Sequence, residues 1–125
     1  MDLKLELVIV PVGDVDQAKA FYADQIGFAV DYDQAPNEHY RIVQLTPPGS
    51  GTSVAIGTNL TQKAAAPGST QGLRLVVDDI DATRLALINR GVDVTDIDDR
   101  PWGRFAWFND PDGNGWELNQ PASQS

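Results

Sequence analysis

The sequence contains no cysteine, a single histidine and only nine basic residues, against eighteen acidic ones in a chain of 125. Without cysteine the chain forms no disulfide and performs no thiol chemistry. The net charge of −9 argues against a nucleic-acid partner, because that binding depends largely on Lys and Arg side chains that neutralise phosphates. No apolar run approaches the roughly 18 residues of a membrane helix, and the first residues lack the basic-then-apolar pattern of a signal peptide. We therefore expect a cytoplasmic protein without a membrane partner.

The residues that are present suit a globular domain, with 42% hydrophobic and 22% charged residues in a chain long enough for a core of its own. Residues 3–10 alternate and then become continuously apolar, which is typical of a strand. Asp14 is the expected N-cap of a helix that ends at Gly27. Short strands are expected to follow at about residues 28–32, 39–46 and 53–57.

The pattern begins again at residue 73, after a surface linker of small and polar residues. Asp79 aligns with Asp14 as an N-cap, and Gly91 aligns with Gly27 as a C-cap, which indicates a duplicated unit. We expect a single domain over residues 1–125, made of module 1 (about 3–57), a linker (58–71) and module 2 (about 72–120). Each module is predicted to contain a strand, a helix and three further strands, in that order. This predicts an α+β architecture with helices behind a curved, mixed and mostly antiparallel sheet.

Several stretches in both halves resemble one protein family, in the same order. They are residues 10–16 (VPVGDVD), 21–22 and 26–28 in the first half, and residues 77–80, 91–92 and 110–118 (DPDGNGWEL) in the second. Together they resemble the vicinal oxygen chelate superfamily, which includes glyoxalase I, extradiol dioxygenases, fosfomycin-resistance proteins and bleomycin-binding proteins. The resemblance spans about residues 5–120 and implies two βαβββ modules of the glyoxalase/bleomycin-resistance fold.

The resemblance also implies a divalent metal held by four side chains, usually His or Gln on the opening strands and Glu on the closing strands. Carried over by position, the four sites fall on Leu7, Gly72, Ala55 and Glu117. Only Glu117 carries a ligand atom in its side chain, and one carboxylate does not make the three- or four-ligand site of a catalytic metal. We therefore expect no metal and no other cofactor. The alternative is a divalent metal (Ni, Zn, Mn or Fe) bound through other ligands.

Glu117 is the first candidate functional residue on its own chemistry. On a strand its side chain points away from those of Trp116 and Leu118, so it faces whatever lies on the other side of the sheet. A carboxylate among aromatic side chains is costly to bury unless it is paired, liganded or protonated, and it suits a general acid or base. His39 is a second candidate for a base or a ligand contact; otherwise it is a solvated side chain at the end of a strand.

Aromatic side chains are concentrated between residues 102 and 116, where all three tryptophans lie. Pockets for small organic molecules are mostly apolar and aromatic, with a few polar groups that fix orientation. Alternation places Phe105 and Trp107 on one face of a strand and Phe108 on the other, and leaves open which face lines a cup. Arg104 either meets an anionic group of a ligand or pairs with nearby Asp side chains. The candidate ligand-binding residues are Trp102, Arg104, Phe105, Trp107, Trp116 and Tyr40.

Two classes of function remain open. The first is a metal-free protein of bleomycin-resistance type that binds a small organic molecule in an aromatic-lined cup; the acidic surface would suit a cationic or neutral aromatic ligand. The second is a metal-independent enzyme, an isomerase, epimerase or lyase, in which Glu117 is the general acid or base. A third, a divalent-metal glyoxalase or dioxygenase, requires metal ligands other than those carried over by position. The resemblance further implies a homodimer in which the partner helps to complete the cup.

Overall fold

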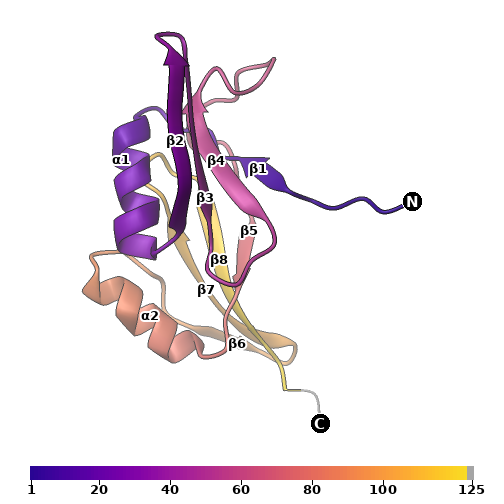
Figure 1. Ribbon diagram of the computed structural model, residues 1–125. Coiled ribbons are helices and arrows are strands. Elements are labelled where there is room, and N and C mark those ends of the chain that lie inside the picture. The colour runs from indigo at the N-terminus through magenta and orange to yellow at the C-terminus, as the bar shows by residue number, and fades with distance from the viewer. Residues whose placement is uncertain (124–125) are drawn as a thin grey trace.

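The computed structural model describes residues 1–123. The first half contains β1 (Leu7–Ile9), the consecutive helices α1 (Val15–Ala20) and η1 (Phe21–Ile26), and strands β2 (Ala29–Asn37), β3 (Tyr40–Thr46) and β4 (Ser53–Thr58). The second half contains β5 (Leu73–Val76), α2 (Ile80–Asn89), β6 (Asp98–Arg100), β7 (Gly103–Asn109) and β8 (Gly115–Pro121). The order of strand, helix and three strands therefore occurs twice (Figure 1). This confirms the predicted α+β fold of two βαβββ modules.

The helix in each half begins where the sequence places a capping aspartate. The Asp14 carboxylate accepts a hydrogen bond from the backbone N–H of Gln17 at 3.0 Å, and that of Asp79 accepts one from Ala82 at 3.1 Å. Each bond satisfies one of the N–H groups that are free at a helix N-terminus. The first helix ends at Gly27, whose φ of 89° is a left-handed conformation that glycine adopts at little cost. In the described residues, no helix is both long and apolar enough to cross a membrane.

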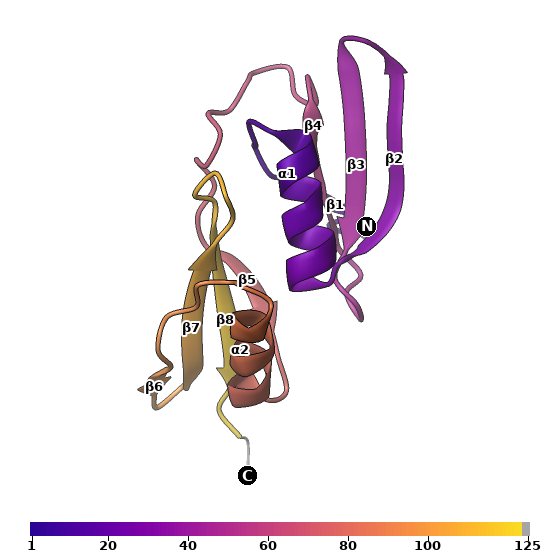
Figure 2. The ribbon, with the colours of Figure 1, turned by 90° about the vertical axis from the view of Figure 1, so that its left-hand side faces the viewer.

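The strands form two four-stranded sheets, in the orders β1-β4-β3-β2 and β5-β8-β7-β6. In each sheet the opening strand pairs in parallel with the closing strand, and the remaining pairs are antiparallel. The helices of both halves lie on the same side of the molecule, on the left in Figure 1 and toward the viewer in Figure 2. β1 and β5 are edge strands, and within residues 1–123 no backbone hydrogen bond joins them. The expected curved surface is thus divided into two separately hydrogen-bonded sheets.

The hydrophobic core lies between the helices and the sheet faces that they cover. Its fully buried members come from both halves and include Tyr22, Leu45, Ile56, Ile80 and Leu118. The Tyr22 hydroxyl links the two halves, because it donates to Asp110 Oδ2 at 2.6 Å and accepts from Trp116 Nε1 at 2.9 Å. Burial and the neighbouring Asp110 carboxylate raise the pKa of Tyr22 well above its usual range. The hydroxyl therefore keeps its proton and remains a donor.

The strand predicted over residues 3–10 is shorter in the structure and begins at Leu7. Leu7 pairs with Ser53, the first residue of β4, so within residues 1–123 no strand pairs with residues 1–6. Leu3 and Leu5, whose alternation suggested the longer strand, are exposed. The N-terminal segment extends from β1 away from the helices (Figure 1). An alternating apolar segment therefore lies uncovered next to an edge strand.

Candidate functional site

One face of the second sheet is turned away from the helices. Alternation on β8 buries Trp116 in the core and turns Glu117 to the opposite face. The register places Arg74 of β5 and Trp107 of β7 directly beside Glu117. Phe105 lies two residues before Trp107 on β7 and shares its face. We call the surface formed by Arg74, Phe105, Trp107 and Glu117 the open face.

Two aromatic rings form the apolar part of the open face. The rings of Phe105 and Trp107 are stacked, with centroids 6.3 Å apart and planes inclined by 15°. Phe105 is buried, whereas Trp107 is 39% exposed. A hollow of about 340 Å³ lies beside the indole and is lined by Gln71, Gly72, Trp107, Asn109, Gly115, Trp116 and Glu117. A rigid, partly exposed ring beside a hollow of this size suits the stacking of a planar organic molecule.

Glu117 is ion-paired rather than isolated among aromatic side chains. Arg74 Nε donates a hydrogen bond to Glu117 Oε2 at 2.5 Å. The guanidinium Cζ of Arg74 lies 5.7 Å from the centre of the Phe105 ring, within the range of a cation–π interaction. A half-buried carboxylate requires a compensating partner, and here the partner is a guanidinium.

The residues at the positions of the family's metal do not fit a divalent cation. Leu7 and Ala55 present only hydrocarbon side chains, and Gly72 has no side chain. A cation at Glu117 would also lie against the positive charge of Arg74. Within residues 1–123, no group of three or more His, Cys, Asp or Glu side chains is placed to hold a metal ion.

Two of the tryptophans named as ligand contacts lie away from the open face. Trp116 is among the residues that line the hollow, but its indole is buried in the core, where Nε1 donates to Tyr22. A ligand contact through this ring stays a prediction. Trp102 lies in the turn between β6 and β7 and is 66% exposed. That turn is at the opposite end of β7 from Asn109, which lines the hollow. Of the three indoles, only that of Trp107 belongs to the open face.

Arg104 lies on the helix-facing side of β7. Its Nε donates to Asp99 at 2.6 Å and its Nη1 donates to Asp81 of α2 at 2.7 Å. The hydrogen bond from Arg104 lowers the pKa of Asp81. Of the two roles that the sequence allowed, pairing with aspartates is the one observed, and a ligand contact by Arg104 stays a prediction.

Tyr40 and His39 belong to the first sheet. Tyr40 is the first residue of β3, and His39 lies in the turn before it. The exposed imidazole has its Nε2 3.3 Å from the carboxylate of Glu38. Neither residue lines the hollow beside Trp107. Within one chain, the structure does not bring them to Glu117.

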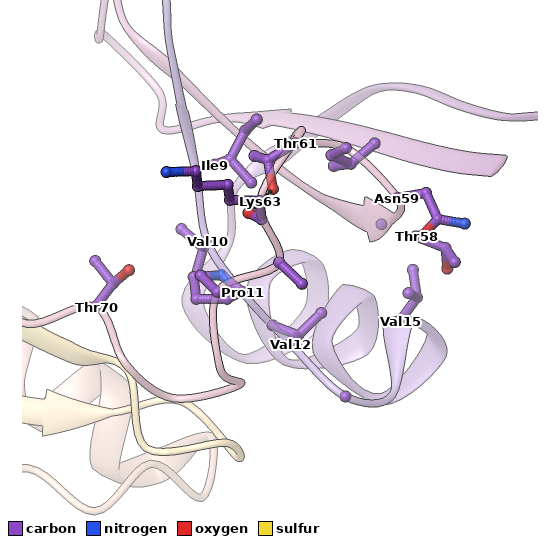
Figure 3. Close-up of a pocket in the computed structure, with 15 residues that line it drawn as sticks. Ile9, Val10, Pro11, Val12, Val15, Thr58, Asn59, Thr61, Lys63 and Thr70 are labelled. Carbon is purple, nitrogen blue, oxygen red and sulfur yellow. Dashed lines mark hydrogen bonds between the residues drawn. The ribbon is translucent and has the colours of Figure 1, made fainter.

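A second hollow, of about 350 Å³, lies where the linker passes the ends of β1 and β4. Its wall combines apolar side chains from residues 9–15 with hydroxyl and amide groups from residues 58–70, and Lys63 is its one charged side chain (Figure 3). The linker is held in place because Gly68 N donates to the carbonyl of Pro11 at 3.1 Å and Thr70 N donates to Asn114 Oδ1 at 3.0 Å. The sequence predicted only a surface linker, since its small residues show no periodicity.

Sequence reasoning also missed Arg74, although a signal was present. Leu73 and Leu75 flank Arg74 as Trp116 and Leu118 flank Glu117. When the apolar neighbours face a core, both charged residues face the other side of their strands. Two opposite charges in matching positions of the opening and closing strands therefore indicate a pair on one face.

The chain is similar to known proteins over nearly its whole length. TnmS3, an antibiotic-binding protein from Streptomyces sp. CB03234, is 42% identical, with a TM-score of 0.86 over 97% of this chain and 98% of that chain. A glyoxalase/bleomycin resistance protein from the same organism is 43% identical, with a TM-score of 0.80 over 94% of this chain and 100% of that chain. The uncharacterized protein YetH of Bacillus subtilis (strain 168) is 29% identical over 117 residues, which are 90% of this chain and 94% of YetH.

A family match covers the same region. Residues 4–118 match the model of the Glyoxalase/Bleomycin resistance protein/Dioxygenase superfamily. This range runs from before β1 to Leu118 in β8, so it covers all of the first module, the second as far as the middle of its last strand, and the duplicated capping motifs. The chain therefore belongs to the Glyoxalase/Bleomycin resistance protein/Dioxygenase superfamily.

Proposed function

We propose that the protein binds a planar aromatic small molecule on the open face, without a metal and without catalysing a reaction. The observation that carries this proposal is the partly exposed Trp107, stacked on Phe105 beside a hollow of about 340 Å³. TnmS3, which is 42% identical, is an antibiotic-binding protein, and this supports a small organic ligand. A preordered indole loses little conformational freedom on binding, so most of the stacking energy is available for affinity.

The metal-free state is tested by calorimetric titration of the purified protein with Ni²⁺, Zn²⁺, Mn²⁺ and Fe²⁺. We expect no stoichiometric site, because Glu117 is the only ligand at the four family positions and is already bound to Arg74. Glu117→Gln serves as the control, because it removes the carboxylate of the proposed site and keeps the surface carboxylates that could bind metal weakly. Uptake of one metal ion by the wild type, lost in Glu117→Gln, would contradict the proposal and restore glyoxalase or dioxygenase chemistry.

The alternative function is a metal-independent isomerase, epimerase or lyase that uses Glu117 as general acid or base. The observation that favours it is the carboxylate beside the hollow on the open face. Glu117→Gln separates the two functions, because glutamine keeps the side-chain shape and an oxygen acceptor for Arg74. For a binder we expect affinity to change by less than about tenfold and the bound molecule to stay unchanged by NMR with both proteins. Turnover by the wild type that falls about 100-fold or more in the variant would establish the enzyme.

We also propose that the protein is a homodimer in which β1 of one copy pairs with β5 of the other. Both strands are sheet edges, and Leu3 and Leu5 before β1 and Val76 on β5 are exposed. Unpaired apolar edges are sites of strand addition, and a two-fold axis would form this contact twice. Each copy would then place its first sheet next to Arg74 and Glu117 of the other and complete the cup.

Light scattering coupled to gel filtration tests the dimer. We expect the wild type to be dimeric, Leu5→Asp to be monomeric and Leu85→Asp on α2 to remain dimeric. The two leucines are matched, since Leu5 is 69% and Leu85 is 60% exposed, and neither change should unfold the chain. A monomeric wild type, or a Leu5→Asp variant that stays dimeric, would rule out this edge as the interface.

A further inference from the structure

We infer that Arg74 contacts the ligand and selects aromatic molecules that carry an acceptor oxygen at the ring edge. Such an oxygen belongs to a carbonyl, a phenolate or a carboxylate. The inference rests on the proposed function, because it adds a polar contact to the same site. It assigns a specificity-determining role to Arg74 and a positioning role to Glu117.

The Arg74 guanidinium is held in place from two sides. Its Nε donates to Glu117 Oε2 at 2.5 Å, and its Cζ lies 5.7 Å from the centre of the Phe105 ring. The Phe105 ring is in turn stacked with the indole of Trp107. Arg74 and Trp107 flank Glu117 on its two neighbouring strands, so a ring stacked on the indole reaches the guanidinium through a group at its edge that extends past Glu117.

In the part of the chain that the structure describes, no hydrogen bond engages the terminal nitrogens of Arg74, which leaves them able to bind a ligand. By comparison, Arg104 donates through Nε to Asp99 and through both terminal nitrogens to Asp81. Within residues 1–123, Arg74 donates to the protein only through Nε, to Glu117. Its two terminal NH₂ groups carry four of the five N–H donors of a guanidinium, and its side chain is 55% exposed.

These donors determine the chemistry of the ligand. A planar guanidinium binds carboxylate or paired carbonyl oxygens through two parallel hydrogen bonds, and an ammonium group offers it no acceptor. The net charge of −9 suggested a cationic ligand, but charges more than about 10 Å apart are largely screened at 0.1 M salt. The polar groups of the open face therefore decide the selectivity. The Glu117 carboxylate already accepts a hydrogen bond from Arg74, so the groups left to bind a ligand are the terminal donors of Arg74.

The experiment compares three probes with the same ring: 2-naphthoate, 2-naphthamide and 2-naphthylmethylammonium. Binding is followed through the Trp107 indole N–H resonance in the full-length protein. We expect naphthoate to bind at least about tenfold more tightly than the ammonium probe, as for a charge-assisted hydrogen bond. In Arg74→Gln the ratio should fall to within about threefold. Arg100→Gln is the control, because Arg100 is 51% exposed, pairs with Asp98 and lies on β6, at the opposite edge of the sheet from Arg74 on β5.

The outcomes separate this inference from the proposed function. Binding of all three probes with equal affinity by the wild type would overturn the role of Arg74 and leave the stacking site intact. A preference for naphthoate that persists in Arg74→Gln, or that is lost equally in Arg100→Gln, would overturn it as well. If none of the probes shifts the Trp107 resonance, the proposed function itself fails and the inference fails with it.

Discussion

Tyr22→Phe is expected to lower the free energy of unfolding by about 2–4 kcal/mol. The substitution keeps the ring and removes only a fully buried hydroxyl. That hydroxyl donates to Asp110 Oδ2 at 2.6 Å and accepts from Trp116 Nε1 at 2.9 Å. Its loss leaves a buried indole N–H without an acceptor and weakens the hydrogen bonding of a buried carboxylate, and each such defect costs about 1–3 kcal/mol. Urea unfolding followed by far-UV circular dichroism measures the change.

Tyr32→Phe is the matched control for this prediction. In the described residues, the Tyr32 hydroxyl makes one hydrogen bond, at the surface, to the half-buried Gln44 side chain, so its removal should cost less than about 0.5 kcal/mol. Equal losses in the two variants would show that the Tyr22 hydroxyl does not link the two modules. Tyr22 lies in η1, whereas its partners Asp110 and Trp116 lie in the β7–β8 turn and on β8. A larger loss in Tyr22→Phe therefore locates part of the stability between the modules.

Trp107→Ala is expected to weaken binding of 2-naphthoate by about 30-fold or more. Truncation of a central aromatic anchor costs about 2 kcal/mol or more in a binding site, and that cost converts to this ratio of dissociation constants. Isothermal titration calorimetry measures both proteins under the same conditions. The physical reason is that Trp107 supplies the exposed ring of the stack on the open face.

Trp102→Ala provides the control for Trp107→Ala. Trp102 is also an exposed indole, but it lies in the β6–β7 turn and does not line the hollow. We expect its removal to change the affinity by less than about twofold. If Trp102→Ala abolished binding while Trp107→Ala preserved it, the ligand would lie at the turn and not on the open face.

The duplicated fold and the orientation of Glu117 could be predicted from local pattern. The N-caps at Asp14 and Asp79 depend on hydrogen bonds within three residues of each aspartate. The alternation of Trp116 and Glu117 depends only on strand geometry. Both features are local in sequence, and both are confirmed.

The contacts of the site residues that the sequence left open or did not predict join distant segments. Arg104 can contact Asp81 only if its face of β7 packs against α2, as it does here. Alternation along the strand separates the two faces but does not say which of them packs against the helix. The partner of Glu117 lies 43 residues away on another strand. Trp116 is held in the core by Tyr22, which is 94 residues away. Such pairings follow from tertiary packing, within the second half for Arg104 and Glu117 and between the halves for Trp116. Of the three, only the Arg74–Glu117 pair leaves a signal in the sequence, in the apolar residues that flank both charges.

The central claim, that a planar molecule stacks on Trp107, is tested most directly by the indole N–H resonances of the wild-type protein. The chain has three tryptophans, of which one lies on the open face, one in an exposed turn and one in the core. Titration with 2-naphthoate is predicted to shift the Trp107 resonance to saturation and to leave those of Trp102 and Trp116 nearly unchanged. Saturable binding that leaves Trp107 unmoved and instead shifts the amides of residues 58–65 would contradict the claim and place the site in the linker hollow.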